Sequence, residues 1–510
     1  MSEAIIYSGT NSGAGIFGYS PNPATNLTAV GKNRKVELKW TDPDDRVIEG
    51  TTVGWSYTKI VRKTGSYPID PNDGTVIVQN SVKNQYQTTP YEDTAIVANT
   101  TYYYTAFACS DYGVFAESAP QAAATPFSYR VMTVKINEND SNPTTCCSYA
   151  DDAVGMPSGR SDEAIRAWQD FIKYRPCAFK NGQVVGYLNP NDFGKFENGD
   201  PNDTSDKTQS VMVEFPRRGI SISRSGSILT ISMTDEPNNS NFTYYAHQRG
   251  AKPCDYFYLS SYLLSCEADD TYEAYRHDWY RSTMNSQCGR TMWATRVYTA
   301  HNDYDGYEIF TWFQRIYFLV ISILQFKRLD IFSAMGDPFT SGDSDGGYTQ
   351  CGYADSKGMF SNWSTEYPHI KMFGIERVNQ GNLILGGVWR YRDVLRMQTD
   401  GLDSNNDYEM SLDINIGSKL QGGILYIKQM DAHPEGFGLL TDGKGSSSTY
   451  YCSYATIYGY SESSSYANYD VTTSAGVGSG STVNGRNIFA IDVKSAANQV
   501  YSFTRLSFYN

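Results

Sequence analysis

The chain has 510 residues, of which 40% are apolar, and 55 acidic against 42 basic residues give it a formal net charge of -13. It has no long basic stripe, so nucleic-acid binding lacks electrostatic support. The opening MSEAIIYSGT has no basic stretch followed by an apolar core, and we expect no secretory signal. The most apolar run, Ile316–Phe326, is about half the ~20 residues that a bilayer span needs and predicts a buried helix.

Cysteine and histidine usage argues against a metal centre. The nine cysteines form an odd set without a CxxC pair, and the five histidines are isolated from one another. With no signal for an oxidising compartment, we expect reduced thiols and no structural disulfide. We also expect no metal and no cofactor.

The first predicted domain follows a short Gly/Ser/Asn-rich segment. Residues 1–20 lack a clear period and indicate a tether or docking segment. Residues 21–126 indicate a β-sandwich that folds independently. In its KVELKW stretch, Val36, Leu38 and Trp40 alternate with charged residues, as expected for a strand with one buried face. The stretch PQAAATP at 120–126 is typical of a linker.

Residues 127–510 mix helical and strand patterns. Residues 161–172 predict an amphipathic helix with Ser161 as N-cap and with Ile165, Trp168 and Ile172 on one face. Residues 176–190 predict a hairpin that turns at Asn181-Gly182.

Further along, 211–216 and 220–238 predict a continuing meander with a turn at Ser225-Gly226, and 307–329 predict a second, mostly buried helix. Residues 369–393 indicate strand, turn, strand. We expect one α+β unit, with a possible split near residue 250.

Two resemblances follow from these patterns. The first unit resembles a fibronectin type III domain, and one tyrosine of Tyr102–Tyr104 is expected to act as its tyrosine corner. The residues that carry this resemblance are Asn26-Leu27-Thr28-Ala29, Trp40 with Asp42-Pro43, Tyr57–Arg62 and Thr101–Ala108.

The rest of the chain resembles phage tail proteins whose last domain has a C-type-lectin-like fold of the formylglycine-generating-enzyme-like subtype. The segments that carry it are 132–156, 175–193, 211–216, the hydrophobic helix, 371–382, 436–452 and 485–510. This resemblance implies a virion protein, made in the bacterial host cytoplasm, that attaches to a host and is a homotrimer. In some members a reverse-transcriptase system that mutates adenines diversifies the last domain.

One window has the composition of a recognition surface. In residues 446–470, 15 of the 25 residues are Ser or Tyr and none is Lys or Arg. Tyrosine supplies rigid contact area and serine supplies adaptable hydrogen bonds. A solvated loop is the alternative. The expected receptor contacts are Tyr450, Tyr451, Tyr454, Tyr458, Tyr460, Glu462, Tyr466, Asn468 and Tyr469.

Other candidate sites are weaker. Glu236-Pro237-Asn238 matches the sugar-binding triplet of calcium-dependent lectins, but the partner Trp-Asn-Asp triplet is missing, so we expect a turn. Cys452 is alone in the last 150 residues, without the second cysteine that formylglycine-generating enzymes use. The pair Asp269-Asp270 sits in a polar stretch typical of solvated surface. We therefore expect no catalytic residues.

The sequence thus predicts a multidomain protein, an all-β fibronectin type III-like sandwich followed by an α+β C-type-lectin-like region, that is not an enzyme. Its expected function is a phage tail adhesin that binds a host cell-surface protein or glycan, with other tail proteins bound through the N-terminus. We expect no nucleic-acid partner and no membrane insertion. Two alternatives stay open: a structural tail or collar component, and a depolymerase of surface glycan.

Overall fold

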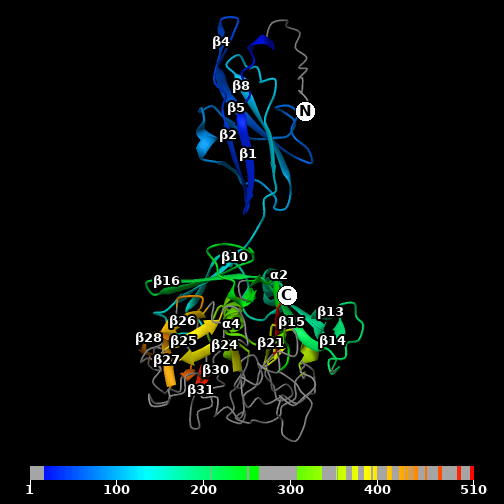
Figure 1. Ribbon diagram of the computed structural model, residues 1–510, viewed down its shortest axis with the longest axis vertical. Coiled ribbons are helices and arrows are strands. Elements are labelled where there is room, and N and C mark those ends of the chain that lie inside the picture. Colours follow the sequence, from blue (N-terminus) through cyan, green and yellow to red (C-terminus); the bar gives the residue numbers. More distant parts are fainter. Residues whose placement is uncertain are drawn as a thin grey trace. The chain divides into compact units, whose positions relative to one another are not determined.

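The computed structural model divides into two compact units, Met1–Tyr129 and Arg130–Asn510 (Figure 1). Strands contain 43% of the residues and helices contain 14%, which confirms a β-rich, multidomain protein. The structure describes residues 17–206, 208–249, 252–263, 307–335, 352, 354–362, 370–376, 384–391, 394–398, 411–415, 424–430, 432–435, 437, 440–445, 454–456, 469–473, 491–494 and 506–509.

Unit 1 is a sandwich of a three-stranded sheet, ordered β1-β2-β7, and a four-stranded sheet, ordered β6-β5-β8-β9, with a separate β3-β4 hairpin. Its strands are β1 (Thr25–Lys32), β2 (Lys35–Thr41), β3 (Arg46–Ile48), β4 (Thr51–Val53), β5 (Trp55–Thr64), β6 (Thr75–Asn80), β7 (Tyr91–Asp93), β8 (Tyr102–Ser110) and β9 (Gln121–Ala124); its short helices are η1 (Phe17–Tyr19) and α1 (Gln85–Thr88).

The alternation in β2 builds the core between these two sheets. Val36, Leu38 and Trp40 are buried, as the sequence predicts, and they pack in one cluster with Ile60 of β5 and Tyr104 of β8. The Trp40 indole donates a hydrogen bond to Asp42 Oδ1 at 2.9 Å, so the largest core ring keeps its polar atom paired.

Tyrosines of β8 connect the sandwich to its loops. Tyr102, at the start of β8, accepts a hydrogen bond on its hydroxyl from Val97 N at 2.8 Å, which is the geometry of a tyrosine corner. Two residues on, Tyr104 donates to Asp93 Oδ2 at 3.1 Å, and Arg62 Nη1 lies 2.8 Å from Asp93 Oδ1. The carboxylate of Asp93 thus joins the two sheets through β7, β5 and β8.

The expected linker at 120–126 is wrong. Gln121–Ala124 forms β9, which pairs with β8 from Tyr102↔Ala124 to Thr105↔Gln121. The small side chains that indicated a linker occupy an edge strand instead. Residues after it also belong to unit 1, since Phe127 N donates to Lys32 O at 3.2 Å and Tyr129 N donates to Asn33 Oδ1 at 2.9 Å.

Unit 2 contains sheets ordered β11-β10-β17-β16, β14-β13-β12-β15-β20-β32-β21, β26-β25-β24-β30-β31 and β28-β27-β29, with two-stranded β18-β19 and β22-β23. The strands are β10 (Val131–Asn137), β11 (Cys147–Asp151), β12 (Arg175–Lys180), β13 (Gln183–Asn189), β14 (Asp192–Phe196), β15 (Ser210–Pro216), β16 (Gly219–Ser225), β17 (Ile228–Thr234), β18 (Gln248–Arg249), β19 (Lys252–Pro253), β20 (Tyr256–Ser260), β21 (Tyr307–Ile309), β22 (Lys371–Met372), β23 (Ile375–Glu376), β24 (Ile384–Tyr391), β25 (Val394–Gln398), β26 (Ser411–Asn415), β27 (Ile424–Met430), β28 (Leu440–Gly445), β29 (Tyr454–Thr456), β30 (Tyr469–Thr473), β31 (Ile491–Lys494) and β32 (Leu506–Tyr509).

The described helices of unit 2 are α2 (Asp162–Ile172), α4 (Trp312–Phe326), α5 (Ile331–Ala334), η2 (Tyr245–His247) and η4 (Asp355–Lys357). Helix α2 begins as predicted, because Ser161 Oγ accepts a hydrogen bond from Ala164 N at 3.2 Å. Its buried face differs from the predicted one: Ala164 and Phe171 are buried with Trp168 and Ile172, whereas Ile165 is only half-buried.

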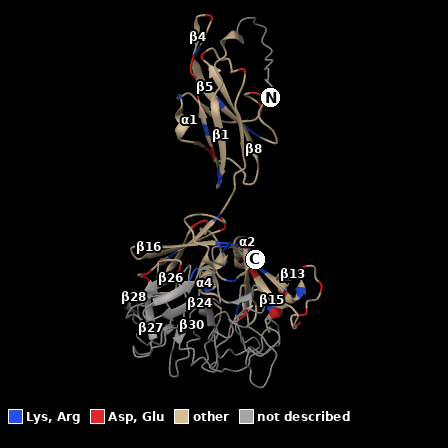
Figure 2. Ribbon diagram, viewed as in Figure 1, with Lys and Arg blue, Asp and Glu red and all other residues tan. Residues whose placement is uncertain are grey.

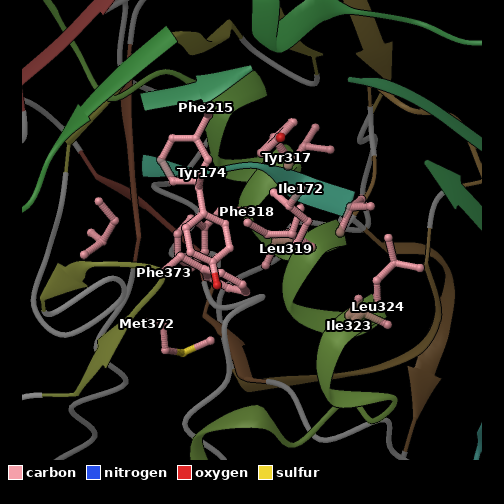
Figure 3. Close-up of a cluster of buried hydrophobic side chains, with 14 of the residues drawn as sticks. Ile172, Tyr174, Phe215, Tyr317, Phe318, Leu319, Ile323, Leu324, Met372 and Phe373 are labelled. Atoms are coloured by element: carbon pink, nitrogen blue, oxygen red, sulfur yellow. The ribbon is translucent and has the colours of Figure 1, made fainter. Parts of the chain in front are cut away.

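All fifteen residues of α4 are buried. Its N-terminus is closed by a capping box between Thr311 and Gln314. Figure 3 shows its Phe318 ring beside Phe373 and Tyr174. The centroid of the Phe373 ring lies 5.2 Å from that of Phe318 and 5.4 Å from that of Tyr174. The predicted helix over 307–329 is too long at its start, because Tyr307–Ile309 pairs with β32 as β21.

The hairpin of β12 and β13 confirms its turn prediction. Asn181 and Gly182 have φ values of 51° and 74°, which suit a two-residue turn with positive φ at both positions. The β16–β17 hairpin turns at Gly226-Ser227, one residue later than predicted. The expected single meander is wrong: β15 lies in the seven-stranded sheet and β16 in the four-stranded sheet.

Residues on both sides of position 250 share one core. Strand β20 pairs with β15 through Phe215↔Phe257 and with β32 through Phe257↔Tyr509, and all three residues belong to the cluster that contains α4. Within the described part of the chain, no helix is both long enough and apolar enough to span a bilayer.

The separate core of unit 1 predicts independent folding. A fragment of residues 17–129 should unfold cooperatively, and Trp40→Ala should lower its free energy of unfolding by about 3–5 kcal/mol because a buried indole leaves a cavity. Lys39→Ala, at an exposed position of the same strand, should change it by less than about 0.5 kcal/mol. Urea unfolding followed by circular dichroism makes the measurement. A fragment without a cooperative transition would contradict the assignment of a separate core.

Candidate recognition site

The structure describes the backbone of the predicted recognition window at two places. Tyr454 begins β29 and is paired with Tyr426 of β27, and Tyr469 begins β30 and is paired with Arg390 of β24. The remaining predicted contacts lie outside the described residues; these are Tyr450, Tyr451, Tyr458, Tyr460, Glu462, Tyr466 and Asn468.

These two strands connect the window to different sheets. Strand β29 is an outer strand of the three-stranded sheet, and β30 lies between β24 and β31 in the five-stranded sheet. Strand β29 also contacts β31. The two described strands of the window therefore lie in different sheets that contact each other.

A buried network of charged groups holds another pair of segments together. Lys371 is fully buried, and its Nζ lies 3.4 Å from Asp355 Oδ1 and 3.3 Å from Ala354 O. Tyr262, just after β20, donates a hydrogen bond to the same Asp355 carboxylate at 2.6 Å. This arrangement joins η4, the β22–β23 hairpin and the end of β20.

Glu376 completes the network from the other strand of the hairpin. Its carboxylate accepts hydrogen bonds from Gly352 N at 2.9 Å and Ala354 N at 3.3 Å. Burial raises the pKa of Glu376, and burial lowers the pKa of Lys371; in each case the opposite charge of the other residue acts against the shift. The network is satisfied internally, so we assign it a structural role in fixing residues 354–362.

This network is not evident from the sequence, because Lys371 and Glu376 lie in the apolar stretch IKMFGIE. Their separation of five residues gave no pairing signal. The two become opposed only because Phe373 and Gly374, with φ values of 52° and 79°, form a tight turn that pairs Lys371 with Glu376.

The Glu236-Pro237-Asn238 triplet is a turn, as predicted. Pro237 and Asn238 lie in the turn itself, and the described peptide bonds are all trans. The Glu236 carboxylate accepts a hydrogen bond from Asn239 Nδ2 at 2.8 Å, and Tyr244 donates to Glu236 O at 2.6 Å. The polar groups of this segment are bonded to its own neighbours.

The described histidine closest to the core is unsuited to proton transfer. His247 is fully buried against the rings of Phe257 and Tyr317, and its Nε2 lies 3.2 Å from Phe215 O. Burial lowers its pKa to about 3, so the ring stays neutral across the physiological range.

The described thiols are enclosed in the two units. The five described cysteines are buried, namely Cys109, Cys146, Cys147, Cys177 and Cys254. The other four cysteines lie outside the described residues, as do Asp269 and Asp270. Among the residues that the structure describes, no group of three or more His, Cys, Asp or Glu side chains could hold a metal ion. Figure 2 shows both signs of charge spread over the described strands.

Comparison with protein-family models finds no match to this chain, and comparison with curated proteins finds none either.

The buried His247 predicts acid sensitivity in unit 2. Its pKa is about 3 in the folded chain and about 6.5 when unfolded, so between these values only the unfolded chain binds the proton. Stability should therefore fall as the pH drops below about 6.5, at up to roughly 1.4 kcal/mol per pH unit from this group. His247→Phe should flatten that slope.

The measurement is the unfolding free energy of the full chain from pH 7 to pH 4. His433→Phe, at an exposed position, should keep the slope of the natural chain. An equal slope in the His247 variant would assign the acid sensitivity to other groups.

Proposed function

We propose that this chain is a non-catalytic adhesin of a bacteriophage tail, which binds a host cell surface through the Ser/Tyr-rich face around residues 446–470. The observation that carries the proposal is the composition of that window, in which 15 of the 25 residues are Ser or Tyr and none is Lys or Arg. Tyrosine supplies rigid contact area and serine supplies adaptable hydrogen bonds, as in antibody paratopes. Two described strands of the window, β29 and β30, lie in sheets that contact each other through β29 and β31.

The architecture of unit 1 supports the same proposal. Its three-plus-four strand order, the buried Trp40 and the Tyr102 corner favour a fibronectin type III-like spacer. For the rest of the chain we propose a C-type-lectin-like receptor-binding domain. A homotrimer, attached to other tail proteins by residues near the N-terminus, is part of this proposal.

The direct test changes the proposed contact rings. Tyr458, Tyr460 and Tyr466 replaced together by Ala should abolish binding of the labelled full chain to bacterial cells that the natural chain binds, because a few aromatic side chains carry most of the energy of an interface. As part of the proposed contact surface, each change should alter stability by less than about 0.5 kcal/mol, as substitutions of surface residues usually do. Binding is measured by flow cytometry on a panel of bacterial strains.

Tyr112→Ala is the matched control, since Tyr112 is an exposed tyrosine of unit 1. It should leave cell binding unchanged. A folded triple variant that binds cells as well as the natural chain would remove this window from the proposal. A triple variant that loses its oligomeric state would favour a structural tail component instead.

A further inference from the structure

A row of polar and aromatic side chains crosses the seven-stranded sheet. Arg175 of β12 is paired with Glu214 of β15, and Glu214 is paired with Tyr258 of β20. Directly opposed residues place their side chains on the same face of a sheet. The neighbours Val213 and Phe257 point into the α4 core, so the row lies on the other face.

Two tyrosines orient the carboxylate at the middle of this row. Tyr187 and Tyr258 both donate hydrogen bonds to Glu214 Oε2, at 3.1 Å and 2.9 Å. The other oxygen, Oε1, accepts no hydrogen bond in the described part of the chain. Glu214 is only 5% exposed, so this oxygen is an oriented acceptor in a nearly buried side chain.

The arginine beside Glu214 forms its ion pair with another carboxylate. Arg175 Nη2 binds the carboxylate of Glu197 at 2.9 Å and 3.0 Å, and its guanidinium lies over the Tyr187 ring, 3.3 Å from the centroid. Among described residues, Glu214 has no ion pair within 4.0 Å. A nearly buried carboxylate oxygen without a hydrogen-bond partner among the described residues can accept a hydrogen bond from a ligand.

The surroundings indicate the kind of ligand. Tyr256 lies two residues before Tyr258 on the same face, is 37% exposed, and has its ring centroid 6.5 Å from that of Tyr258. The site thus offers a charged acceptor, an exposed aromatic ring and the partly exposed guanidinium of Arg175. Sugars match this set, because adjacent hydroxyls bond charged planar groups while their C–H faces pack on aromatic rings.

We propose that Glu214, with Tyr187, Tyr256, Tyr258 and Arg175, forms a saccharide-binding site that accepts pyranose hydroxyls on Glu214 Oε1. The inference rests on the proposed function and deepens it, because it names a saccharide as a host-surface ligand. It adds a site on the seven-stranded sheet that is separate in the chain from the window at 446–470.

The test is saturation-transfer NMR of the full chain with a panel of methyl pyranosides of glucose, galactose, mannose, N-acetylglucosamine and rhamnose. At least one glycoside should receive saturation from the natural chain. Glu214→Gln should weaken its binding at least about tenfold, since the charged acceptor is lost, while the amide oxygen can still accept from both tyrosines and preserve the fold. Tyr256→Ala should also weaken binding.

Glu163→Gln, at an exposed position of α2, is the control and should bind as the natural chain does. Melting temperatures of all variants establish that they are folded. Absence of saturation transfer to every glycoside, or unchanged binding by a folded Glu214→Gln variant, would overturn the inference. A chain that binds cells but none of the glycosides would defeat the saccharide site alone and leave the adhesin proposal in place.

Discussion

Complete burial of α4 is the constraint on which unit 2 depends. A helix without a solvent-facing side must be surrounded, and strands from several sheets together with α2 supply the surrounding atoms. Its ends must also satisfy their backbone groups without bulk water. The Thr311–Gln314 capping box does so at the start, and at the end Lys327 N donates to Ile323 O at 2.8 Å.

Polar groups that are buried in this unit also need hydrogen-bond partners, and two of its buried charged sites differ in how they obtain them. Lys371 and Glu376 are fully enclosed, and their charges are met by Asp355 and by backbone groups, so they serve to fix the chain. Glu214 differs because, among the described residues, its hydrogen bonds use one of its two carboxylate oxygens. Because of this contrast in hydrogen bonding, we assign Lys371 and Glu376 a structural role and propose that Glu214 binds a ligand.

Local features of the sequence predict local structure well. Alternation predicted the buried face of β2, Asn181-Gly182 predicted a hairpin, and Ser161 predicted the start of α2, because each depends on a few neighbouring residues. The predictions were wrong where strand pairing with residues distant in the sequence determines the structure. The Ala-rich segment 121–124 is a strand only because β8 pairs with it, and β15 and β16 differ in sheet because β12 and β20 flank β15.

The candidate sites follow the same rule. Composition alone singled out the window at 446–470, whereas Glu214 stood unnoticed in the apolar stretch VMVEFP until Tyr187 and Tyr258 were brought to it from other strands. The one indication of a site in this stretch of the sequence was a charged residue, Glu214, within an otherwise apolar strand. Its meaning depended on a cross-strand register that no local pattern contains.

Hydrogen exchange of the full chain, free and bound to the envelope of a bacterium that it recognises, tests the central claim most directly. The account predicts that binding slows exchange of backbone amides in residues 446–470 and leaves the strands of unit 1 unchanged. Slower exchange confined to unit 1, with 446–470 unaffected, would contradict it.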